Sequence, residues 1–281
     1  MAEGGSVDAG RTRGGKGGGG VSQGHPADMG AHVINEVLAR NDVDPMAVED
    51  VVFGCVDTLG PQAGDIARTA WLAAGLPEAI PGTTIDRQCG SGQQAVSFAA
   101  MGVMSGLQDL VVAGGVQNMS MIPIGLALEA ARPFGHEDPF SGSTGWVARY
   151  GTQEVSQFRG AELIAEKWNI SREEMEAFAF TSHERAITAI DEGRFEREVA
   201  PLAGVEVDEG PRRGGSIEKM AQLAPLVDGG RITAALASPV SDGAAAIPVA
   251  SARATQAPGP PPPPPTPPIR LPSAPPPLSP T

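Results

Sequence analysis

The chain has 281 residues, 41% of them hydrophobic, and its formal net charge at pH 7 is -13. This length allows one large domain or two, and the acidic character argues against binding to nucleic acid or attraction to anionic membranes. No apolar run is long enough to span a bilayer, and the first five residues lack the pattern of a signal sequence, so we expect a cytoplasmic protein. The two cysteines, Cys55 and Cys89, have no metal-site spacing and are too few for a disulfide scaffold, so no metal is predicted.

Residues 1–27 are rich in glycine and are expected to be weakly ordered, with Gly14 to Gly20 as a flexible linker. Asp28 is placed to cap the first helix, whose apolar residues recur at helical spacing. The elements expected after it are a strand at 51–56, a helix at 66–74, a short strand at 81–85, a helix that starts near Cys89, and a strand at 110–113. This βαβαβ order predicts an α/β domain with a parallel sheet that helices cover on both faces.

The pattern changes after Ser120. Glycine, proline and polar residues predict an irregular excursion from Pro123 to Ser143, and helices are expected over 157–168 and 171–192. Ser171 and Glu174 have the spacing of a capping box at the start of the second helix, and Gly193 is placed to end it. The predicted apolar face of this helix consists of Met175, Phe178, Ala179, Ala186 and Ile190. Residues 254–281 form a proline-rich tail that we expect to be disordered.

Cys89 is the strongest candidate for chemistry. It lies in the run Asp86 to Ala95, where an extended segment meets a helix that is apolar almost all round and is therefore expected to be buried. Unpaired amides and the dipole at a helix start favour the thiolate and lower the pKa of a thiol placed there. Gly90 and Gly92 leave room for a substrate beside the sulfur. The alternative is an inert, buried cysteine, which is the more common role of free cysteine in general. Cys55, within an apolar strand, is interpreted as a core residue.

Three segments carry a resemblance to a known family: Val7 to Lys16, the stretch Val51 to Ser120 with its "DRQCGSGQQAV" run, and Ser238 to Ser251. Together they resemble thiolases of the acetyl-CoA acetyltransferase type over roughly residues 6–253. The resemblance implies that Cys89 is acylated by an acyl-CoA and then passes the acyl group to coenzyme A or acetyl-CoA. Backbone amides at the helix start, those of Gly90 and Ser91, would stabilise the oxyanion.

The resemblance also implies a domain layout. Residues 28–122 would form the first core half with the nucleophile, 123–233 the loop domain that covers coenzyme A, and 234–253 the beginning of a second core half that is largely missing. Ser251, Ser156 and Gln157 match family positions that contact coenzyme A, although many relatives carry His-Met at the last two. Ser251 can equally be an ordinary strand-end serine. Coenzyme A thioesters would be substrates, with no bound cofactor.

Histidines are weighed because a thiol nucleophile usually needs a base. His25 is interpreted as a surface residue, His32 and His183 as solvated helix residues, and His136 stays a candidate. The family's late elements, a Gly-His-Pro-x-Gly histidine, a second cysteine and an Asn-Glu-Ala-Phe-like segment, have no counterpart here. We therefore expect a truncated thiolase with impaired turnover.

Two alternatives remain open. The chain could be a non-catalytic acyl-CoA-binding or dimerisation partner of an intact thiolase, or a member of another ketoacyl-synthase branch, which ranks last. The resemblance implies a homo-oligomer, or pairing with an intact thiolase.

Overall fold

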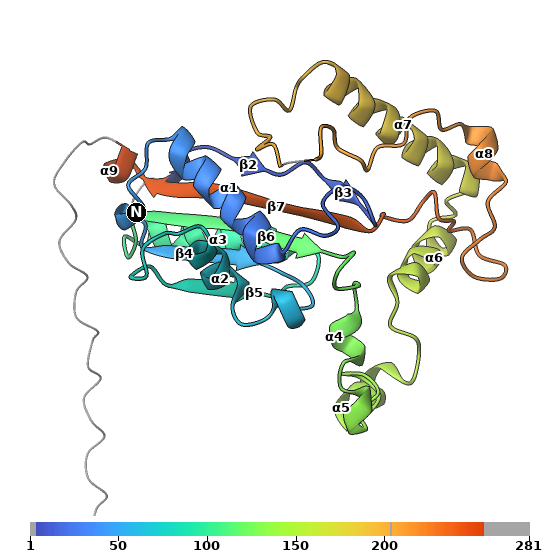
Figure 1. Cartoon of the computed structure of the whole chain (residues 1–281). Helices are drawn as coiled ribbons and strands as arrows, with labels where there is room; N and C mark the ends of the chain where they lie inside the picture. The colour runs from blue at the N-terminus through green and yellow to red at the C-terminus, as the bar shows by residue number, and fades with distance from the viewer. Residues whose placement is uncertain (1–3, 203, 256–281) are drawn as a thin grey trace, which may run out of the picture.

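The computed structural model describes residues 4–202 and 204–255, which form an α/β fold around one sheet (Figure 1). The strand order is β1-β7-β6-β4-β5, and β2 and β3 also pair with β7. The strands are β1 (Gly4–Ser6), β2 (Gly10–Arg11), β3 (Gly15–Lys16), β4 (Asp50–Gly54), β5 (Gly82–Ile85), β6 (Leu110–Asn118) and β7 (Ser241–Ser251). Because β4 runs parallel to both β5 and β6, the predicted βαβαβ arrangement is confirmed.

Helices cover both faces of the sheet. On one face lie α1 (Pro26–Arg40) and α2 (Ile66–Ala73), and on the other lies α3 (Ser91–Met104). Side chains of a strand alternate between the faces: Leu110, Val112 and Val116 of β6 belong to the cluster under α1 and α2, whereas Val111 and Ala113 pack with α3. The core is therefore two apolar layers separated by the sheet.

The remaining helices follow β6. They are α4 (Leu126–Glu129), α5 (Thr144–Tyr150), α6 (Gln157–Lys167), α7 (Arg172–Asp191) and α8 (Ile217–Ala221), while α9 (Ala252–Thr255) follows β7; short 3-10 turns lie at Pro45–Ala47, Gly60–Gln62 and Arg132–Phe134. Figure 1 shows α4 to α8 beyond the edge at which β6 ends. The predicted capping box of Ser171 and Glu174 is confirmed. The segment expected to be irregular holds short helical turns, and α5 was not predicted.

Residues 234–253 do not begin a second core half. Their strand β7 pairs antiparallel with β6 along its whole length, from Leu110 opposite Ala250 to Asn118 opposite Asp242. The alternation of alanines on β7 matches this position, because Ala244, Ala246 and Ala250 are buried under α1. The segment therefore completes the sheet of the first half.

The glycine-rich start is not a flexible linker. From Gly4 to Lys16 it forms β1, β2 and β3 along β7. Glycine permits this because a side chain would collide: a Cβ on Gly15 would lie 2.1 Å from Val21. Backbone amides of Lys16 and Gly20 donate to the Glu209 carboxylate, which holds the loop after β3. The β7 backbone supplies the order that these residues lack intrinsically.

Three further expectations are wrong. The first helix begins at Pro26 with His25, not Asp28, as its N-cap. The helix after Cys89 is buried along one face only, because Phe98, Met101 and Met104 are exposed. On α7, Phe178 of the predicted apolar face is also exposed. Periodicity identifies an apolar face but not the element that covers it. The proline-rich tail lies outside the described residues from position 256 onward, and its first two residues belong to α9.

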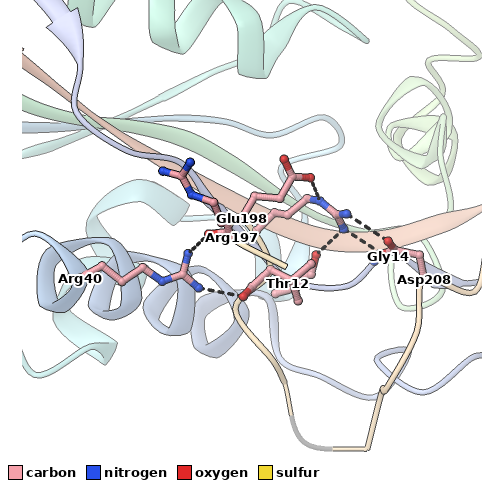
Figure 2. Close-up of polar contacts among 8 residues, drawn as sticks. Thr12, Gly14, Arg40, Arg197, Glu198 and Asp208 are labelled. Atoms are coloured by element: carbon pink, nitrogen blue, oxygen red, sulfur yellow. Dashed lines mark hydrogen bonds and ion pairs between the residues drawn. The ribbon is translucent and has the colours of Figure 1, made fainter. Parts of the chain in front are cut away.

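The chain that returns from α7 is bound to the sheet by an arginine network (Figure 2). Arg11 donates to the Asp208 carboxylate through two nitrogens, at 2.8 and 3.0 Å, and to Glu198 at 2.7 Å. Arg40 of α1 donates to the carbonyls of Arg197 and Val199, each at 2.8 Å. Such bidentate, charge-assisted bonds fix orientation as well as distance.

Substitution of Asp208 tests how much this arginine network stabilises the fold. Burial raises the pKa of its carboxyl, but the Arg11 guanidinium and the Gly14 amide outweigh this and hold the pKa below its usual value. A depressed pKa stabilises the fold above the unfolded-state pKa, and this stabilisation is lost as pH falls through the folded-state pKa. We expect Asp208→Asn to lower the free energy of unfolding at pH 7 by about 1.5–3 kcal/mol, and the gap to the parent chain to close as pH falls below about 4.

Denaturant unfolding at several pH values measures this difference. Asp191→Asn is the matched control, because Asp191 pairs with Arg213 on the surface and its loss should change stability little. An equal effect of both substitutions at pH 7 would show that the Arg11 network does not hold the returning chain.

Candidate active site

Cys89 lies on a tight turn between β5 and α3. The strand ends at Ile85, Gly90 is the N-cap of the helix, and the Cys89 side chain is exposed. This confirms the prediction that the helix starts within two residues of the cysteine. Gln88 has a φ of +48°, which is uncommon for a residue with a side chain. Its amide donates to the Asp86 carboxylate at 2.8 Å, which stabilises this conformation and presents the next residue to solvent.

Ser91 holds the turn closed from inside. Its side chain is buried, and its hydroxyl accepts from the Arg87 amide at 2.8 Å and donates to the Gln88 carbonyl at 2.6 Å. The Gly90 amide donates to the Arg87 carbonyl and the Ser91 amide to the Gln88 carbonyl, at 3.1 and 3.0 Å. These two amides were predicted as oxyanion donors, but in this conformation both already have partners. Either could serve only if its turn bond broke.

A close backbone contact at Gly54 fixes the distance between the turn and the sheet. A Cβ on Gly54, the last residue of β4, would lie 2.3 Å from both the Gly92 nitrogen and the Ser91 carbonyl carbon. Gly115 of β6 is equally close-packed, since its Cβ would be 2.6 Å from the Gly54 oxygen. The first turn of α3 therefore lies directly on the strand backbone, and no side chain fits between them.

Buried amide and carboxyl groups hold the loops at the same edge of the sheet. Asn118 accepts from Met121 through its side chain and donates to the carbonyls of Ser22 and Gly24, while its backbone amide donates to Gln62. The Gln62 side chain in turn donates to the carbonyls of Val56 and Asp57. The Asp57 carboxylate accepts from the amides of Gly125 and Ala127, at 2.8 and 2.7 Å. The segments that follow β4 and β6 are therefore tied to neighbouring loops.

A cleft of about 540 Å³ opens beside the turn that carries Cys89. It is bounded by the ends of β4 and β5, by the loop after β6 and by the start of α6, and its lining includes Gln88, Asp86, Asp57, His136 and Gln157. Gln157 thus shares a cleft with Gln88, the residue before Cys89. Ser156 caps α6 through its hydroxyl and does not line the cleft.

Ser251 lies at the other end of the sheet. It pairs near Leu110, where β6 begins, whereas Cys89 follows the end of β5, which runs parallel to β6 through β4. Its hydroxyl donates to the Asp109 carboxylate at 2.7 Å, and its amide to the Asp109 carbonyl. The interpretation as a strand-end serine fits this position, and the structure separates Ser251 from the cleft.

The second cysteine differs from Cys89 in every respect. Cys55 is 2% exposed in the core, and burial, together with the nearby Asp86 and Asp57, raises the pKa of its thiol to about 12. Its interpretation as a core residue is confirmed. The described residues contain no group of three or more His, Cys, Asp or Glu side chains that could hold a metal ion. Within the same residues, the helices lack the length and apolar character needed to cross a membrane.

Sequence reasoning named His136 and Gln157 of the cleft wall but missed Asp57, Gln62 and Asn118. One signal could have found some of them: polar residues directly after parallel strands gather at the carboxyl edge of the sheet, where α/β proteins bind ligands. Asp57 and Asn118 stand at such positions after β4 and at the end of β6.

Comparisons with known proteins identify relatives of this chain. The family description "Thiolase, N-terminal domain" matches residues 6–253. The steroid 3-ketoacyl-CoA thiolase FadA6 of Mycobacterium tuberculosis is 57% identical over 254 residues, covering 89% of this chain and 62% of that protein. A beta-ketoadipyl-CoA thiolase of Acinetobacter baylyi is 35% identical, covering 87% and 65%.

Among solved structures, the acetyl-CoA acetyltransferase of Bacillus anthracis superposes with a TM-score of 0.74 at 30% identity, covering 91% of this chain and 67% of that one. The chain thus spans less than two thirds of the length of the two curated relatives named above.

Gly54→Ala tests the contact that positions Cys89. The added methyl group would collide with backbone atoms of Ser91 and Gly92, which cannot rotate away. We expect a loss of about 1–3 kcal/mol in the free energy of unfolding and slower alkylation of Cys89, because the start of α3 must move. Thermal melts and iodoacetamide labelling measure the two effects.

Gly160→Ala is the control, since this glycine lies within α6 with nothing within 4 Å of the added atom. It should be stabilising by about 0.4–1 kcal/mol. Unchanged labelling in Gly54→Ala would contradict the proposed contact.

Proposed function

Because the chain belongs to the thiolase family, we propose that it carries out the acylation step of thiolase-type acyl transfer, with Cys89 as the nucleophile. The Cys89 thiolate attacks the carbonyl carbon of an acyl-CoA thioester, the bond from that carbon to the coenzyme A sulfur breaks, and the released coenzyme A thiolate takes up a proton. In the synthetic direction, the carbanion of acetyl-CoA attacks the acyl-cysteine, a 3-ketoacyl-CoA forms and the Cys89 thiolate leaves. In the cleavage direction, Cys89 is acylated instead by a 3-ketoacyl-CoA: the bond between C2 and C3 breaks, the departing acetyl-CoA carbanion takes up a proton, and the thiolate of coenzyme A then takes the acyl group and releases the Cys89 thiolate. A covalent intermediate of this kind gives ping-pong kinetics.

The observation that carries this proposal is the exposed thiol at the start of a helix. Cys89 directly precedes the N-cap of α3, a helix of 14 residues, at the end where the helix dipole is positive. A thiolate is the reactive form of cysteine, and the exposed sulfur of Cys89 is accessible to a substrate. Cys55, by contrast, is enclosed and its thiol pKa is raised to about 12, so it does not compete.

The cleft beside the turn supports the proposed binding of an acyl-CoA. Its volume, about 540 Å³, lies in the range of small-molecule sites, and its wall combines apolar residues with polar and acidic ones. We propose that the acyl-CoA enters here, between the nucleophile turn and the segment that carries Gln157. His136 is the histidine of the described residues that lines this cleft, and we assign it contact with substrate rather than activation of Cys89.

Full turnover requires more than acylation of Cys89. The carbanion step needs a group that removes a proton from acetyl-CoA. The sequence holds no second cysteine in a glycine-rich motif and no Gly-His-Pro-x-Gly histidine. We therefore propose that this chain forms the acyl-cysteine but does not complete carbon–carbon bond formation or cleavage by itself. The relatives' names indicate 3-ketoacyl-CoA compounds as the substrate class.

A second candidate role is that of a non-catalytic partner for an intact thiolase. It is favoured by the outer face of α3, where Phe98, Met101 and Met104 are 46%, 61% and 44% exposed. Contiguous apolar surface of this kind marks a protein contact. Co-expression with a tagged full-length thiolase would show the pairing as a stable complex, and recovery of the chain only as a homo-oligomer would exclude it.

Acetyl-CoA labelling tests the main proposal. We expect incubation of the purified chain with acetyl-CoA to add one acetyl group, measured by intact mass and mapped by peptide digestion to Cys89. Cys89→Ser should abolish this adduct, and Cys55→Ser should retain it, because Cys55 is enclosed in the core. An adduct on Cys55, or none on a folded sample, would contradict the assignment.

A further inference from the structure

Gln117, near the end of β6, carries a buried donor without a partner. Its Oε1 accepts from the Val56 amide at 3.0 Å. Its Nε2 is enclosed but makes no hydrogen bond within the part of the chain that the structure describes. Leaving a buried donor unpaired is costly, and such groups in native proteins call for an explanation. One explanation is a partner that forms only when the protein works.

The side chain of Gln117 belongs to the face of the sheet that carries the nucleophile. Because side chains alternate along a strand, Gln117 is on the same face as Val111 and Ala113, which pack under α3. Gly115, between them and Gln117, contacts Gly54, and Gly54 lies beneath the first turn of α3. Gln117 is therefore one step beyond that first turn, toward the edge of the sheet where Cys89 lies.

Two of the amides nearest to Cys89 in the sequence are already engaged. The amides of Gly90 and Ser91 already bond to turn carbonyls. The charged groups on the elements around the turn are mainly acidic: Asp57 after β4, Asp86 and Arg87 on the turn, and His136 and Asp138 in the loop after β6. The Cys55 thiol, whose pKa is raised to about 12, also lies against Gln117, with its sulfur 3.8 Å from Oε1. Carboxylates disfavour a thiolate near them. A neutral amide that donates a hydrogen bond to the sulfur would offset this unfavourable electrostatic effect without adding charge.

We propose that Gln117 is a positioning residue for the Cys89 nucleophile. Its Oε1 fixes the end of β4 through Val56, and its Nε2 donates toward the sulfur as the thiolate forms. This inference deepens the proposed function, because it names a group that supports the acylation step, but it concerns thiolate formation and is measured without acyl-CoA.

The test follows iodoacetamide labelling of Cys89 as a function of pH. Gln117→Met removes the donor at similar volume, and Gln117→Glu keeps the acceptor for Val56 but replaces the donor with an acid. We expect the midpoint of the labelling profile to rise in both variants, with labelling at pH 7 about tenfold slower for each unit of pKa. The plateau rate at high pH should stay that of the parent chain.

Gln153→Glu is the matched control, because it makes the same chemical change at an exposed loop position and should leave the midpoint unmoved. Thermal melts check the fold of each variant. A parent-like midpoint in folded Gln117→Met would overturn the proposal. So would a variant that no longer folds, or one that loses the plateau rate, since either result assigns Gln117 to structure alone. A shifted midpoint without any acetyl adduct would retain this inference while rejecting the proposed function.

Discussion

The contact between the end of β4 and the first turn of α3 is the constraint on which the candidate site depends. At Gly54 the strand backbone touches the backbone of Ser91 and Gly92, so the helix start has one available height above the sheet. Ser91 then closes the turn from below, and Gln88 takes a left-handed conformation above it. The exposure of Cys89 follows from these three features together. A rigid strand end and a helix start place the sulfur more reproducibly than a loop could.

Around this contact, hydrogen bonds between side chains and loop backbone hold the edge of the sheet. Asn118, Gln62 and Asp57 link the segments after β4 and β6 with the segment before α1 through hydrogen bonds. Buried polar groups of this kind specify one arrangement when all of them are paired. The Nε2 of Gln117 differs from these groups because it is buried and, among the described residues, unpaired. In the proposed role, its partner is the Cys89 sulfur and the bond forms only with the thiolate.

Much of the core could be predicted from sequence because its signals are local. The βαβαβ order, the helix start beside Cys89 and the capping box of Ser171 each depend on residues a few positions apart. The membership of β7 in the first sheet could not be predicted, since an antiparallel strand gives no local sign of its partner. The order of the glycine-rich start depends on that same strand. The hydrogen bonds of the Gly90 and Ser91 amides to turn carbonyls could not be predicted either, because they depend on turn geometry, which composition does not encode.

The position of β7 has a consequence for how the chain acquires its fold. β7 pairs with β6 and also carries β1, β2 and β3, yet the whole segment from Met119 to Val240 is synthesised between β6 and β7. Closing so long a loop delays the pairing, and non-local strand pairs form slowly. Until then, on the ribosome, the β6 edge is open to other strands. The interval between making these two strands is therefore the period of greatest risk of aggregation.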